Sequence, residues 1–140
     1  MSSNEREHPR LASDLPVVVS FGEVLASEST YLNDISAGGV GFNAMVPLEP
    51  GAVLILQLPP GRPVLSTPVR VVWCRQVGLH YAVGSEFLSK NMALRERIVA
   101  MVQQIEDYRT ETARDGRSLS AQHAALEWID RFGKDFFSAA

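Results

Sequence analysis

The sequence predicts a mainly β fold, a six-stranded antiparallel β-barrel followed by one or two C-terminal α-helices. Three observations lead to this expectation. Residues 16–87 contain six short runs rich in β-branched and aromatic residues, with no helical run between them. Proline and glycine clusters at residues 47–51 and 59–63 mark tight turns. After Phe87 the apolar period lengthens from two to between three and four, which indicates helix.

The six expected strands are joined by short connections, with residues 27–29 as one of the turns. We therefore expect an antiparallel meander that closes or nearly closes into a barrel. Trp73 is assigned to the core or the barrel wall. Gly84 interrupts the last strand, and such a glycine marks a bulge, a barrel bend or the close approach of a ligand. The expected strands occupy residues 16–25, 30–33, 39–46, 53–58, 69–74 and 79–87.

Two helices are expected after the barrel. The first covers residues 91–113, is capped by Ser89 or Asn91, and carries an apolar stripe spaced 4, 3, 4, 3 at Leu94, Ile98, Met101, Ile105 and Tyr108. The stripe packs on its own domain or forms a helix–helix dimer seam. The second covers residues 118–137, with Leu126, Ile129, Phe132 and Phe136 on one face and Trp128 and Phe137 off it. It covers the barrel, pairs with the first helix as a hairpin, or docks on another chain.

Composition indicates one ordinary globular domain with an appendage. The chain has 140 residues, of which 46% are hydrophobic and 21% charged. Its net charge of −3 and sequence pI near 5.6 give no overall attraction to nucleic acid polymers or anionic membranes. The longest apolar run, residues 52–56, is far too short for a membrane span, and the N-terminus is polar. We therefore expect a cytoplasmic protein.

Residues 33–42 form the most distinctive segment, a polar turn between two strand-like runs. Asp34 and Ser36 are two residues apart, so in an extended chain their side chains point to the same side. Gly38 and Gly39 allow backbone N–H groups to approach a ligand with no Cβ in the way. This pattern suits an anion or a base edge. By itself, however, such a pattern is more typical of a hairpin in which the aspartate and the serine cap their own backbone.

Arg6 and Arg10 form a second polar pattern ahead of the first strand. Pro9 argues against a helix here, but two long side chains can still converge on one ligand from an extended segment. Guanidinium groups suit phosphate oxygens and the O6 and N7 edge of guanine. By itself, a pair of arginines near a terminus is typical of a solvated tail.

Taken together, these motifs resemble the PilZ domain family over about residues 5–110. The resemblance rests on Arg6-Glu-His-Pro-Arg10 and Asp34-Ile-Ser36-Ala-Gly-Gly39, followed by residues 69–73 and 81–87. It implies a small antiparallel β-barrel with a following helix, and in many members a receptor for the bacterial second messenger cyclic di-GMP. We therefore expect a flexible arginine-bearing segment at 1–12, the barrel and first helix at 13–113, and an additional helix at 114–140 that lies outside the resemblance.

The resemblance implies a ligand site made of Arg6, Arg10, Asp34, Ser36, Gly38 and Gly39. On this interpretation the arginines contact the phosphates and the guanine O6 and N7 edges, and Asp34 accepts from guanine N1–H and N2–H. Ser36 orients that carboxylate or touches the ligand, and the glycines permit close backbone approach. Binding would order the N-terminal segment across the barrel mouth, which makes a switch.

The expected function is a nucleotide receptor that changes conformation and signals to a protein partner. No nucleophile–base pair, metal-ligand spacing or phosphate-binding glycine loop is apparent, so we expect no enzyme activity, metal or cofactor beyond the cyclic di-GMP ligand. The alternative is a nucleotide-independent PilZ-like adaptor that acts through its C-terminal helices. A homodimer through these helices also stays open.

Overall fold

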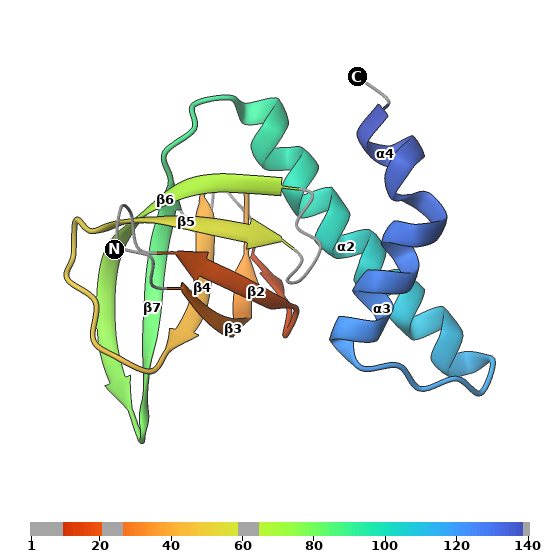
Figure 1. The fold of residues 1–140 in the computed structure, drawn as a ribbon, viewed down its shortest axis with the longest axis horizontal. Helices are drawn as coiled ribbons and strands as arrows, with labels where there is room; N and C mark the ends of the chain where they lie inside the picture. Colours follow the sequence, from red (N-terminus) through yellow and green to blue (C-terminus); the bar gives the residue numbers. More distant parts are fainter. Residues whose placement is uncertain (1–9, 21–26, 59–64, 139–140) are drawn as a thin grey trace.

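The computed structural model describes residues 10–20, 27–58 and 65–138. A curved antiparallel sheet forms one part of the molecule, and helices form the other (Figure 1). The strands are β1 (Leu11–Ala12), β2 (Pro16–Ser20), β3 (Ser27–Ile35), β4 (Gly39–Ala44), β5 (Val53–Leu58), β6 (Leu65–Val77) and β7 (His80–Phe87). The helices are α2 (Met92–Arg114), α3 (Ala121–Trp128), the π-helical turn η1 (Ile129–Gly133) and α4 (Lys134–Ser138).

Six of the strands close into a barrel, as expected. The order is β3-β2-β5-β6-β7-β4, and pairing of β4 with β3 completes the circuit. β1 is an additional short strand that pairs with the end of β3, at Ile35 and Asp34. It continues the line of β2 along β3, because Ser13 N–H donates to Asn33 O and Leu32 N–H donates to Leu15 O between the two strands. The first ten described residues are thus attached to β3 along most of their length.

The predicted meander is wrong at two places. β2 pairs with β5, and β4 pairs with β7, so β4 and β5 are not neighbours although they are consecutive. Strand order depends on which edges meet after the chain folds, and local alternation does not encode it. Residues 27–29, expected as a turn, belong to β3, and β1 was not foreseen. The expected strand residues 21–25 and the whole turn at 59–63 lie outside the described residues.

The first helix packs on its own barrel. Asn91 Oδ1 accepts from Leu94 N–H as the N-cap. The stripe residues Ile98, Met101 and Ile105 are fully buried and belong to the same core as the inward-facing residues of the strands. The interpretation of the stripe as part of its own domain is therefore confirmed.

The second helical segment pairs with α2 as a helical hairpin, one of the three arrangements that the sequence left open. Its buried face carries Ala121, Ala124, Ala125 and Trp128, whereas Phe132 is 44% exposed. The predicted face was wrong in assigning Trp128 to the other side. Trp128 follows Ala121, Ala124 and Ala125 at regular helical spacing on α3, and the period breaks only after it, at the π-helical turn Ile129–Gly133 that contains Phe132. Among the described residues, no helix is long and apolar enough to cross a membrane.

Candidate functional site

The fold brings Arg10 to Asp34 across 24 residues of sequence. Arg10 directly precedes β1, whose Ala12 lies opposite Asp34 on β3. Arg10 Nη1 donates to Asp34 Oδ1 at 2.8 Å, and the two side chains are 42% and 31% exposed. An ion pair this exposed contributes roughly 0–1 kcal/mol, so both groups can exchange partners at small cost. Arg6 lies outside the described residues.

Ser36 shapes its own turn. Its Oγ accepts from Gly38 N–H at 3.1 Å, and its N–H donates to Gly39 O at 2.9 Å. The residue is only 4% exposed. For Ser36 the structure thus shows the capping arrangement that the sequence offered as one alternative, whereas the Asp34 carboxylate contacts Arg10. The serine holds the turn that follows Asp34.

Gly39 is required by the barrel itself. A Cβ at this position would lie 2.0 Å from Ser85 O on β7, which is closer than any real contact. Gly38 O accepts from Phe87 N–H at 3.1 Å, so this part of the turn is also attached to β7. Both glycines therefore seat the turn against the neighbouring strand.

A row of four residues crosses four strands, and sequence reasoning assigned only one of them, Asp34, to the site. Asp34 lies opposite Gly41, Gly41 opposite Gly84, and Gly84 opposite Trp73. A Cβ on Gly41 would lie 2.7 Å from Asp34 Oδ1, and a Cβ on Gly84 would lie 2.1 Å from Trp73 Nε1. The Asp34 carboxylate and the Trp73 indole therefore lean over the two glycines from opposite sides. We call these four residues the glycine floor.

Trp73 faces outward, although the sequence assigned it to the core or barrel wall. A register shift between Val71 and Trp73 adds one residue to β6, so Val71 is buried whereas Trp73 is 43% exposed. The isolated glycine at 84 was the one available signal, since such a glycine marks a bulge or a close approach. The sequence could not say that the approaching group is the Trp73 ring.

Arginines flank the tryptophan end of the glycine floor. The Arg75 guanidinium lies 5.7 Å from the Trp73 ring centroid. Arg70 on β6 lies opposite Glu86 on β7 and donates to its carboxylate at 3.0 Å. On its other side, Glu86 lies opposite Gly39 of β4. A flat strip with an indole, a carboxylate and nearby guanidiniums offers stacking, an acceptor and anion contacts. A planar base can use the stacking surface and the acceptor, and phosphate groups attached to it can use the guanidiniums.

A separate open pocket of about 440 Å³ lies where β1 and β3 meet α2. Its lining includes two carboxylates, Asp14 and Glu106, and no glycine of the floor. The negative charge makes it unsuited to phosphate oxygens. Within the described part of the chain, no group of three or more His, Cys, Asp or Glu side chains could hold a metal ion.

Comparisons with solved structures find the same fold in proteins of low sequence identity. The isolated PilZ domain of Escherichia coli YcgR, solved with c-di-GMP, has a TM-score of 0.59 and 16% identity, over 78% of this chain and 97% of that one. YcgR in complex with c-di-GMP has a TM-score of 0.58 and 15% identity, over 80% of this chain and 50% of that one. The Bacillus subtilis inhibitor of motility MotI/DgrA has a TM-score of 0.52 and 20% identity, over 71% and 48%.

The chain thus spans about half the length of the YcgR and MotI/DgrA chains. No curated protein sequence matches it. A family model of the PilZ domain matches residues 4–104, which include both the arginine and the Asp-x-Ser motifs, and the barrel agrees with it. The chain belongs to the PilZ domain family.

Proposed function

We propose that this chain is a cytoplasmic receptor that binds cyclic di-GMP on the outer face of its barrel, over the glycine floor, and signals to a protein partner. The observation that carries the proposal is the Arg10–Asp34 contact at the end of that floor. Both YcgR structures with which the chain shares its fold contain c-di-GMP, which supports the ligand.

The proposed contacts follow from the chemistry of each side. Arg10 and Arg6 bind phosphate oxygens and the O6 and N7 acceptors of guanine. Asp34 then accepts from guanine N1–H and N2–H, in place of its present contact with Arg10. Ser36, Gly38 and Gly39 hold the turn in place. The missing side chains of Gly41 and Gly84 let the Asp34 carboxylate and the Trp73 indole lie close against the sheet, where the carboxylate can accept from the ligand and the indole can stack on it.

Isothermal titration calorimetry with purified protein tests this proposal. We expect binding to the unmodified chain and at least about tenfold weaker binding for Arg10→Ala and Asp34→Ala, since each removes a charged hydrogen-bonding group worth about 1.5–3 kcal/mol. Matched controls are Arg114→Ala and Asp107→Ala, which remove the same charges at exposed positions of α2. No heat of binding for the unmodified protein would exclude the receptor. Normal binding by both site variants would refute the site.

The second candidate is a nucleotide-independent adaptor that acts through the C-terminal helices. The observation that favours it is Phe132, a large aromatic residue that is 44% exposed on the helical hairpin. A partner captured equally well with and without nucleotide, and lost with Phe132→Ala, would support it. A homodimer would also have to use such an exposed face, because the stripe on α2 is buried. Light scattering measures this directly.

A further inference from the structure

β1 is the shortest of the described strands and lies between the proposed ligand site and the helices. It consists of Leu11 and Ala12 alone, which pair with Ile35 and Asp34 of β3. Arg10 directly precedes β1, and its side chain donates to Asp34. Two pairs of residues hold a strand only weakly. The attachment of β1 to the barrel must therefore depend on the contacts at its two ends.

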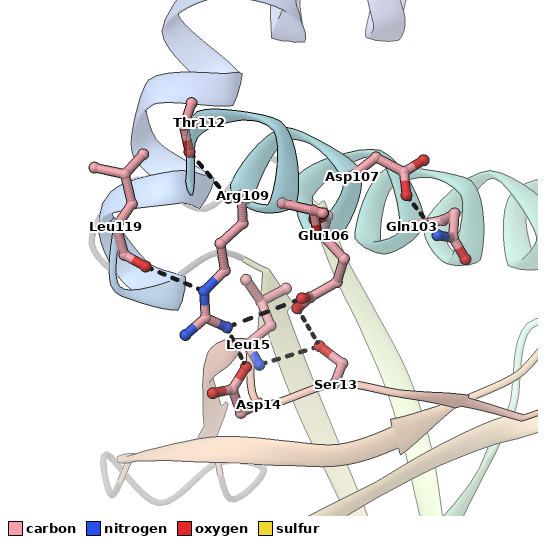
Figure 2. Close-up of polar contacts among 10 residues, drawn as sticks. Ser13, Asp14, Leu15, Gln103, Glu106, Asp107, Arg109, Thr112 and Leu119 are labelled. Carbon is pink, nitrogen blue, oxygen red and sulfur yellow. Dashed lines mark hydrogen bonds and ion pairs between the residues drawn. The ribbon is translucent and has the colours of Figure 1, made fainter. Parts of the chain in front are cut away.

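Ser13 fastens the other end of β1 to helix α2. Its Oγ donates to Glu106 Oε2 at 3.2 Å and accepts from Leu15 N–H at 3.1 Å. Its own N–H donates to Asn33 O, one residue before Asp34. Ser13 is 8% exposed, so these bonds are largely shielded from water. Figure 2 shows Ser13 lying directly beneath Glu106.

Arg109 extends the attachment to the second helix of the hairpin. Its Nη1 donates to Asp14 Oδ1 at 2.8 Å, and its Nε donates to Leu119 O at 3.1 Å. Glu106 Oε1 lies 3.9 Å from the same Nη1. Leu119 belongs to the connection between α2 and α3. One guanidinium therefore joins the residue next to Ser13, the helix α2 and the start of the helical hairpin's second arm (Figure 2).

We propose that Ser13, Asp14, Glu106 and Arg109, here called the clamp, couple occupancy of the ligand site to the packing of the helical hairpin. The inference rests on the proposed function. A ligand that bridges Arg10 and Asp34 holds β1 against β3, and docked β1 presents Ser13 and Asp14 to α2. On this proposal β1 has two states, docked on β3 or released. Both the ligand site and the clamp shift the equilibrium towards the docked state. Coupling between two sites is reciprocal. If ligand binding raises the equilibrium constant for forming the clamp by some factor, the formed clamp raises the ligand's affinity by the same factor.

The size of the coupling follows from exposure. The Asp14 side chain is 64% exposed and that of Arg109 is 32% exposed. A pair so accessible to water contributes little, which corresponds to a coupling factor of about two- to fivefold. Such a link is weak enough to be released and remade, as a reversible signal requires.

The test compares Asp14→Ala with a matched control, Asp107→Ala. Both remove one carboxylate at an exposed position, but Asp107 accepts from the Gln103 side chain of its own helix and lies outside the clamp. Asp14→Ala should weaken cyclic di-GMP binding by about two- to fivefold in calorimetry. In hydrogen exchange it should also speed exchange of residues 121–128 and reduce the protection that the ligand gives them. Asp107→Ala should change neither quantity.

Equal affinity of the two variants, together with unchanged exchange at 121–128, would overturn the coupling while leaving the receptor intact. Failure of the unmodified protein to bind would instead contradict the proposed function. The coupling is then judged without ligand, from Arg10→Ala and Asp14→Ala. Faster exchange at 121–128 in both supports a mechanical link from the Arg10 end of β1 to the hairpin, and unchanged exchange in either excludes it.

Discussion

Gly39 and Gly84 both lie where a side chain has no room, but their obstacles differ in kind. At Gly39 the obstacle is the backbone of β7, since Ser85 O would lie 2.0 Å from a Cβ. At Gly84 it is the indole of Trp73, a side chain 43% exposed to solvent. A backbone in a closed barrel cannot withdraw, whereas an exposed ring can rotate away. Substitution by alanine should therefore lower the free energy of unfolding by different amounts at the two positions.

Gly39→Ala should destabilise the protein by about 1–3 kcal/mol, as overpacking against a fixed backbone does. Gly84→Ala should cost less than about 1 kcal/mol, because Trp73 can move into solvent, and should weaken ligand binding by altering the floor. Urea denaturation followed by far-ultraviolet circular dichroism measures both free energies of unfolding. Each variant is the control for the other, and equal losses would contradict the assignment of the two obstacles.

At the scale of elements, a polar cluster joins the two arms of the helical hairpin. Tyr108 Oη donates to Glu127 Oε1 at 2.8 Å, and Arg117 donates to both oxygens of the same carboxylate, at 3.2 and 2.7 Å. Hydrogen bonds from Arg117 and then from Tyr108 lower the pKa of Glu127. The bond to Glu127, followed by burial, raises the pKa of Tyr108. The cluster therefore favours an ionised glutamate and a neutral tyrosine.

This cluster predicts a loss of hairpin stability in acid. A carboxylate whose pKa is lowered by folding stabilises the protein above the unfolded pKa and ceases to do so as the pH falls through the folded value. Glu127→Gln should thus be less stable than the unmodified protein at neutral pH, and the difference should shrink from pH 4.5, the ordinary pKa of this group, downward. Denaturation at a series of pH values gives the difference. A stability difference between the two proteins that stays constant from neutral to acid pH would contradict the role of the ionised Glu127.

At the scale of the whole molecule, barrel and helices share one core. Phe42 and Leu56 from the strands, Ile98 and Met101 from α2, and Trp128 from α3 belong to a single buried cluster. A molecule with one continuous core unfolds as one cooperative unit. A ligand bound to the barrel must therefore stabilise the helices as well.

Cyclic di-GMP at about 100 times its Kd should raise the free energy of unfolding by about 2.7 kcal/mol. For a domain of this size, that corresponds to an increase in Tm on the order of 10 °C. Thermal melts followed through helix and aromatic signals should shift together. Arg10→Ala should show no comparable shift at the same ligand concentration, and separate transitions for the two signals would argue against a shared core.

The sequence by itself determined what depends on near neighbours along the chain. Alternation identified the six barrel strands, and the spacing of Ile98, Met101 and Ile105 identified the buried face of α2, because both signals are periodic and local. The two polar motifs pointed to Arg10 and Asp34. These predictions needed no knowledge of which strands become neighbours.

The tertiary structure alone decided how distant segments meet. Strand order, the outward turn of Trp73 at the β6 bulge, and the meeting of Gly41 with Gly84 depend on pairing between strands that are far apart in sequence. The packing of α3 on α2 likewise placed Trp128 in the core, although the sequence had put it off the apolar face. Asp14 and Arg109, 95 residues apart, carry no local pattern at all. Their contact exists only because the closed barrel and the packed helix bring them together, which no periodicity along the chain encodes.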